Sequence, residues 1–138
     1  MIRVSYGFHP EQKDRILNLI DAASEDCRER TGHGFLHKSD ELLRTSELFF
    51  AIDEEGVISG FALVRHFEVA SIYVVPSTRR TGTGKTLLAE IKSVAPAGIL
   101  WAKIHDRNLA SQGLFAGAGF SKRDRISPGS GYYFWRVP

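Results

Sequence analysis

Residues 76–86 form a short glycine-rich segment that carries the residue types needed to hold a phosphate group. The segment lies between an apolar stretch typical of a strand and a stretch with helical periodicity, which predicts a strand-to-helix turn. Free backbone N–H groups and the positive end of a helix dipole meet at such a turn and bind anions. The candidate phosphate ligands are Arg79, Arg80, Thr81, Gly82, Thr83, Gly84 and Lys85.

Two known phosphate-binding patterns compete for this segment. Gly84, Lys85 and Thr86 look like the end of the phosphate-binding loop of nucleotide hydrolases. That loop requires a glycine five residues before its last one, and this chain has Arg79 there. The pattern of a nucleotide hydrolase therefore fails at a defining position.

The second pattern is Arg/Gln-x-x-Gly-x-Gly/Ala after a strand that ends in Val-x-Pro. Val74-x-Pro76 and Arg79-x-x-Gly82-x-Gly84 match it throughout. In this segment the chain resembles the GNAT family of N-acetyltransferases, in which the turn binds the pyrophosphate of coenzyme A. The resemblance implies acetyl-CoA as cosubstrate.

A second stretch strengthens the resemblance. After the next strand, the family carries Asn-x-x-Ala-x-x-x-Tyr-x-x-x-Gly-Phe on a helix. This chain has Asn108, Ser111, Phe115, Gly119 and Phe120 at the same spacing. The resemblance is good over residues 68–120 and looser over the first 50 residues.

The resemblance also implies roles for individual residues. In the family, two neighbouring strands splay apart, so that backbone groups at a strand end bond the pantetheine arm of the cofactor; this role falls here on Tyr73, Val74 and Val75. Asn108 would contact the cofactor from the facing helix, with Ser111 and Phe115 on the same motif. The implied reaction is attack of a primary amine on the thioester, which transfers the acetyl group directly.

That reaction needs a base for the amine proton and a proton donor for the departing thiolate. The family position of the donor is tyrosine, and this chain has Phe115, which cannot give a proton. Water or one of the hydroxyl groups of Ser111, Tyr132 and Tyr133 would have to replace it. The candidate base is Glu68, because family members often use a strand carboxylate. The alternatives are His66, His105 and Asp106.

Charge divides unevenly along the chain, and this bears on the acceptor. Residues 1–70 hold 8 Lys/Arg against 13 Asp/Glu, whereas residues 71–138 hold 10 against 3. If the acidic half shapes the acceptor site, a cationic amine on a small molecule or a protein is favoured. Two other functions remain open: an acyl-CoA sensor without turnover, suggested by Phe115, and a nucleic-acid-binding module, suggested by the basic half and less favoured.

The elements that must position these residues follow from periodicity. Strands are predicted at 2–6, 48–52, 57–66, 68–75, 99–104, 120–126 and 132–137, and helices from about residue 10, at 39–45, 83–94 and 108–118. The order is β-α-α-β-β-β-α-β-α-β-β, an α/β fold with a mixed sheet. Strands 48–75 should form an antiparallel meander, and the unit 68–104 should join parallel strands.

Composition sets broader expectations. A length of 138 residues fits one domain, residues 1–138. The single cysteine, Cys27, cannot form an internal disulfide, and no Cys/His spacing suggests zinc, which favours a cytoplasmic protein without a metal. No apolar run suggests a membrane span or a leader. A homodimer through the C-terminal hairpin is a further expectation, since edge strands can pair between subunits.

Overall fold

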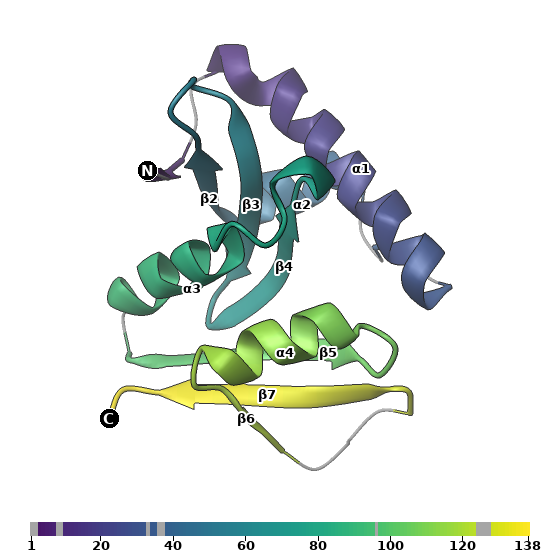
Figure 1. Cartoon of the computed structure of the whole chain (residues 1–138), viewed down its shortest axis with the longest axis vertical. Coiled ribbons are helices and arrows are strands. Elements are labelled where there is room, and N and C mark those ends of the chain that lie inside the picture. Colours follow the sequence, from purple (N-terminus) through teal and green to yellow (C-terminus); the bar gives the residue numbers. More distant parts are fainter. Residues whose placement is uncertain (1–2, 8–9, 33, 36–37, 96, 124–127) are drawn as a thin grey trace.

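The computed structural model describes residues 3–7, 10–32, 34–35, 38–95, 97–123 and 128–138 (Figure 1). Its seven strands are β1 (Arg3–Tyr6), β2 (Glu47–Ile52), β3 (Ile58–Arg65), β4 (Glu68–Val74), β5 (Ile99–His105), β6 (Ser121–Lys122) and β7 (Ser130–Arg136). Its helices are α1 (Lys13–Thr31), α2 (Ser39–Thr45), α3 (Thr83–Ser93) and α4 (Leu109–Gly117), with short 3-10 turns η1 (Pro10–Gln12) and η2 (Pro76–Thr78). The predicted order of elements is confirmed.

All seven strands form one sheet in the order β1-β2-β3-β4-β5-β7-β6. Strands β2 to β4 form the predicted antiparallel meander, and β1 extends it by pairing antiparallel with β2. Strand β7 is antiparallel to both of its neighbours, β5 and β6. The two groups meet where β4 and β5 run parallel. The sheet is therefore mixed, with its only parallel contact among the described strands at its centre.

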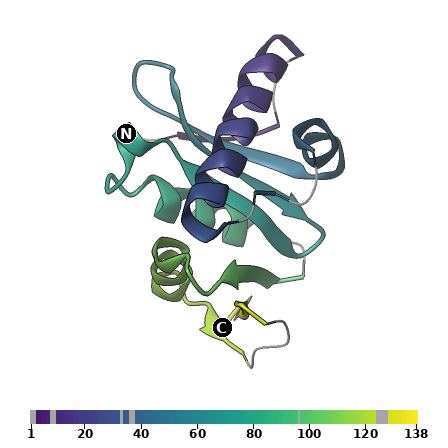
Figure 2. The same cartoon turned by 90° about the vertical axis from the view of Figure 1, so that its right-hand side faces the viewer.

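Helices cover the two faces of the sheet unequally. The core beneath α1 and α2 is built from alternate residues of β2 and β3, such as Leu48, Phe50 and Leu63. The core beneath α3 and α4 spans β2 to β7 and includes Leu88 and Leu100. In Figure 2, α1 crosses the strands of the N-terminal half and α3 lies behind them. One face of β5 and β7 is thus packed by a helix, and the other is not part of the α1–α2 core.

The predicted bounds differ from the structure mainly at the ends of the chain. Helix α2 has the predicted bounds, whereas α1 extends to Thr31, beyond the apolar stripe that indicated it, and ends at Gly32 with a left-handed φ of 85°. Strand β6 is only two residues long, and β7 begins at Ser130, earlier than predicted. The rest of the predicted strand 120–126 lies mostly outside the described residues.

The described residues also bear on membrane spans and metal sites. Among the described helices, none is long and apolar enough to cross a membrane. In the same part of the chain, no group of three or more His, Cys, Asp or Glu side chains is arranged to hold a metal ion.

Candidate functional site

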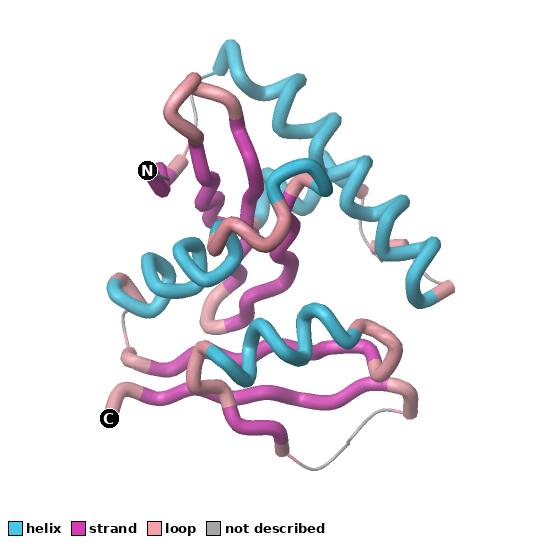
Figure 3. The backbone as a smooth tube through the Cα atoms, in the orientation of Figure 1, coloured by secondary structure: helices cyan, strands magenta, loops and turns pink. Residues whose placement is uncertain are grey.

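The site is a split in the centre of the sheet. Strands β4 and β5 are paired only at Glu68 and Trp101, where the Trp101 N–H donates to the Phe67 carbonyl oxygen at 2.8 Å. Beyond this pair the two strands diverge, as the magenta strands of Figure 3 show. The result is a cleft of about 610 Å³ between β4, β5, the end of α1 and the start of α4.

The open edge of β4 presents backbone groups to this cleft. The Val75 N–H donates to the carbonyl oxygen of Ser59 on β3 at 2.9 Å. Because backbone groups alternate between the two edges of a strand, those of Val74 and Ile72 point away from β3 and toward β5. Near Ala70 the register with β3 shifts, so this residue is a bulge at the narrow end of the cleft.

The three strand residues that the sequence suggested as ligands of the pantetheine arm do not all face the cleft. Tyr73 and Val74 line the cleft, whereas Val75 does not, and the Val75 N–H is already bonded. Ile72 lines the cleft and points its backbone groups into it, and the sequence reading missed it. The alternation of backbone direction along β4, counted from Val75, identifies Ile72. This count can be made only when the pairing of β4 with β3 is known.

The predicted turn follows β4 and leads into α3. Gly82 is the residue that precedes the helix and has a left-handed φ of 86°, a conformation that glycine adopts without strain. Arg80 also has a positive φ, of 69°. Within the described chain, no backbone bond outside the helix interior uses the N–H groups of residues 80–85. The turn therefore offers a row of N–H donors at the start of a helix, which suits an anion.

The side chains of the turn divide between surface and core. Arg80, Thr81 and Lys85 are exposed, and Arg80 also lines the cleft. Thr83 is buried, with its hydroxyl 2.9 Å from that of Thr81. Gly84 is buried as well, and a Cβ atom there would lie 3.0 Å from a methyl carbon of Leu114 on α4. Gly84 thus allows α3 to approach α4 closely.

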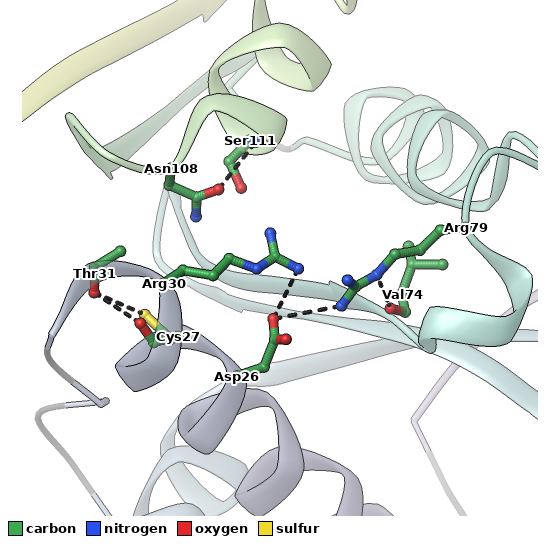
Figure 4. A network of polar contacts seen from close by, with 8 residues as sticks. All are labelled: Asp26, Cys27, Arg30, Thr31, Val74, Arg79, Asn108 and Ser111. Atoms are coloured by element: carbon green, nitrogen blue, oxygen red, sulfur yellow. Dashed lines mark hydrogen bonds and ion pairs between the residues drawn. The ribbon is translucent and has the colours of Figure 1, made fainter.

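Arg79 ties the turn to two other elements (Figure 4). Its Nε donates to the Val74 carbonyl oxygen at 3.0 Å, and its guanidinium lies 5.6 Å from the centre of the Tyr73 ring. A terminal nitrogen also donates to the Asp26 carboxylate on α1, at 3.4 Å. The contacts of Arg79 therefore brace the strand end beside the cleft.

Asp26 and Arg30 are site residues that sequence reasoning missed. The Asp26 carboxylate accepts from Arg79 and also pairs with Arg30 at 2.8 Å, so it joins two guanidinium groups from different elements. Both Asp26 and Arg30 line the cleft. Asp26 and Arg79 are 53 positions apart in the chain, and no local pattern could have predicted their contact.

The opposite wall of the cleft is the start of α4. Asn108 precedes the helix, and its side-chain oxygen accepts from the Ser111 N–H at 3.2 Å, which is a helix-capping bond. Ser111 and Phe115 lie one turn apart and line the cleft with Asn108. Phe115 is buried and packs edge-on against Phe120, with 4.9 Å between ring centres.

The three candidate hydroxyl donors take different places. Ser111 lines the cleft. Tyr133 is buried in the core beneath α3 and α4, while Tyr132 stacks on Trp101 on the other face of the sheet. Of the three, Ser111 is the one that the structure places on the cleft wall.

Glu68 lies at the closed end of the split, outside the residues that line the cleft. It is half-buried, and burial raises the pKa of its carboxyl above the usual value, while the nearby charges of Arg65 and Lys103 partly oppose the rise. Among the alternatives, His105 lines the cleft, and its Nδ1 accepts from the Arg107 N–H at 3.1 Å. His66 lies in the turn between β3 and β4.

The fold and the site together define a mixed α/β protein that can hold an extended ligand in a split sheet, with a phosphate at one end. The sequence of residues 14–120 matches the model of the acetyltransferase (GNAT) family. Because this match covers more than half of the chain, the chain belongs to the GNAT family of acetyltransferases. A comparison of the sequence with curated proteins finds no match.

Solved structures show the same fold at low sequence identity. A GNAT acetyltransferase of Streptococcus agalactiae is similar with a TM-score of 0.78 and 15% identity, covering 99% of this chain and 96% of that one. YncA of Salmonella typhimurium, solved with acetyl-CoA, has a TM-score of 0.70 and 16% identity, covering 99% and 93%. A Bacillus subtilis acetyltransferase, solved with CoA, has a TM-score of 0.71 and 16% identity over 100% of both chains.

Proposed function

We propose that this chain is an acetyl-CoA-dependent N-acetyltransferase that transfers the acetyl group to a primary amine by direct attack on the thioester. The observation that carries the proposal is the split between β4 and β5, which leaves backbone groups of Ile72 and Val74 facing a cleft. The pantetheine arm contains two amides, and these can bond to such groups as a neighbouring strand would.

The other end of the cofactor suits the turn before α3. The pyrophosphate would accept from the N–H groups of residues 80–85, and Arg80 and Lys85 would add positive charge. Similar proteins have been solved with acetyl-CoA or CoA, which supports this cofactor as the ligand. Asn108 and Ser111 would contact the arm from α4, across the cleft.

The chemistry then needs few groups from the protein. The neutral amine nitrogen forms a bond to the acetyl carbon, the C–S bond breaks, and the sulfur leaves as a thiolate. A base, for which Glu68 remains the candidate, takes the proton that the nitrogen loses. A backbone N–H group of β4 that the pantetheine arm leaves free can polarise the carbonyl oxygen, as preorganised donors do in acyl transfer.

A glycine pair tests the cofactor site. Gly82 and Gly56 have φ values of 86° and 79°, and a Cβ atom at either would meet nothing within 4 Å. Gly82→Glu and Gly56→Glu should therefore cost similar backbone strain, about 1 kcal/mol. Only Gly82→Glu places a carboxylate at the turn, so only this variant should lose acetyl-CoA binding in calorimetry. Equal affinity in both variants would contradict the assignment.

Phe115 favours a second candidate function, an acyl-CoA sensor that binds without turnover. The residue is 2% exposed and offers no proton to a departing thiolate. Thiol release in the presence of a panel of amines separates the two functions. Release with an amine supports the transferase, whereas acetyl-CoA binding without release on any amine supports the sensor.

A further inference from the structure

An open face of the sheet lies beside the junction of β4 and β5. Along β5, Leu100 and Ala102 are buried beneath α3 and α4, so Trp101 and Lys103 project from the opposite face. In the described chain, the core beneath α1 and α2 includes no residue of β5, β6 or β7. This face, which we call the acceptor face, lies next to the split, and its Trp101 and Tyr132 side chains are partly exposed.

Charged and aromatic groups meet on the acceptor face. Trp101 and Tyr132 stack with ring centres 5.9 Å apart and planes at 28°. Lys103 is exposed, is paired in register with Tyr132, and also lines the cleft. Glu68 on β4 lies in register with Trp101 on β5 and with Arg65 on β3, so all three residues share this face. A carboxylate, an ammonium group and two stacked rings are thus adjacent.

Three of the five acidic side chains of α1 have polar partners within the described chain. Asp26 is paired with two arginines, Glu25 pairs with Arg28 at 3.3 Å, and Asp21 accepts a hydrogen bond from Ser39. The acceptor face itself sets the carboxylate of Glu68 beside the positive charges of Arg65 and Lys103, so the negative net charge of the N-terminal half does not describe this face. A polyamine placed there would meet the like charges of Lys103 and Arg65, which disfavours it.

We propose that the acceptor is a free aromatic α-amino acid. Its amine lies at Glu68, its carboxylate binds Lys103, and its ring packs on Trp101 and Tyr132. An α-amino acid carries an amine and a carboxylate on one carbon, which matches the neighbouring opposite charges of Glu68 and Lys103. Stacking of aromatic rings adds a preference for a planar side chain.

This inference rests on the proposed acetyl transfer. The amino acid nitrogen bonds to the acetyl carbon, the C–S bond of acetyl-CoA breaks, and the nitrogen gives its proton to the Glu68 carboxylate. The products are an N-acetyl amino acid and coenzyme A, whose thiolate takes a proton from solvent or Ser111.

The test compares acceptors that differ by one group. Thiol release gives kcat/KM for L-phenylalanine, 2-phenylethylamine, which lacks the carboxylate, and L-alanine, which lacks the ring. In Lys103→Gln, the preference for phenylalanine over phenylethylamine should fall about tenfold, because the substrate carboxylate loses its charge-assisted contact with Lys103. Lys13→Gln removes an exposed charge from the start of α1 and should leave this preference unchanged. Trp101→Leu should lower the phenylalanine-to-alanine preference about fivefold.

The outcomes distinguish a failure of the aromatic amino acid proposal from a failure of the proposed acetyltransferase function. Loss of the carboxylate preference in Lys103→Gln alone supports the inference. An unchanged preference, or spermidine used better than phenylalanine, overturns it. Binding of acetyl-CoA without acetylation of phenylalanine overturns the proposed acceptor but not the proposed cofactor site. Failure to bind acetyl-CoA overturns both the acceptor and the cofactor site.

Discussion

Under the proposed function, Phe115 takes the place of the family tyrosine that would give a proton to the departing thiolate. We expect Phe115→Tyr to raise kcat about tenfold, because a hydroxyl on this cleft wall can donate to the sulfur. Phe120→Tyr is the matched control, since Phe120 is buried against Phe115 and does not line the cleft. Thiol-release kinetics at saturating acetyl-CoA measure both variants.

The interpretation of that experiment depends on Ser111. If Ser111 relays the proton in the natural chain, Ser111→Ala should lower kcat without changing the Kd for coenzyme A. It should have no effect in the Phe115→Tyr background, where the tyrosine supplies the proton. A rise in kcat with Phe120→Tyr as large as with Phe115→Tyr would contradict the assigned position.

If Glu68 is the base, kcat/KM should fall on the acid side of the pH profile, where its carboxylate is protonated. Burial raises the pKa of this carboxyl, and Arg65 and Lys103 oppose the rise. A base acts in its ionised form, so kcat/KM should increase as pH rises through the raised pKa. Glu68→Gln should lower kcat/KM about a hundredfold and remove this limb. An unchanged limb in the variant would assign the base to another group, with His105 next.

The same shift has a consequence for stability. A carboxyl whose pKa is raised by folding binds its proton more tightly in the folded state, so folding is favoured below the pKa and loses that contribution as pH rises through it. Glu68→Gln should therefore be more stable than the natural chain at neutral pH. The difference should shrink as pH falls below the ordinary glutamate pKa of about 4.3, where the carboxyl becomes protonated in both states. Urea unfolding at several pH values measures this.

At the scale of elements, the turn before α3 contains two arginines with different expected roles. Arg79 bonds the Val74 carbonyl oxygen, pairs with Asp26 and lies over Tyr73, whereas Arg80 is exposed. Arg79→Ala should lower the free energy of unfolding by about 1–2 kcal/mol. Arg80→Ala should change it by less than about 0.5 kcal/mol but weaken coenzyme A binding about tenfold.

Thermal unfolding and calorimetry with coenzyme A separate these effects. A loss of stability in Arg80→Ala equal to that in Arg79→Ala would contradict the division of roles. Asp26→Asn extends the test, because it removes the bridge between α1 and the turn while both guanidinium groups stay. This variant should be less stable and should not bind coenzyme A more weakly, since the cleft becomes more positive.

The elements also show what the sequence could and could not predict. Periodicity found the strands, the bounds of α2 and the glycine turn, because each depends on residues close in the chain. The direction of the Ile72 backbone depends on pairing with β3 and on the bulge near Ala70. The contact of Asp26 with Arg79 depends on where α1 crosses the sheet. Such features arise from packing between distant segments, and a sequence pattern does not record them.

For the whole molecule, the split means that two groups of strands are joined by one backbone pair and by the core beneath α3 and α4. A ligand that fills the split should therefore stabilise the entire chain. At a hundredfold excess over its Kd, acetyl-CoA should add about 2.7 kcal/mol to the free energy of unfolding. For a chain of this size, that corresponds to an increase in Tm of roughly 10 °C.

Amide hydrogen exchange can locate that stabilisation within the strand that borders the split. The Ile72 and Val74 N–H groups face the cleft, whereas the Val75 N–H is bonded to Ser59. Without ligand, Ile72 should exchange fast and Val75 slowly, because exchange requires a broken hydrogen bond. Acetyl-CoA should slow exchange at Ile72 and Val74 far more than at Val75, if the pantetheine arm takes the place of a neighbouring strand. Equal protection of all three would instead indicate general stabilisation by a ligand bound elsewhere.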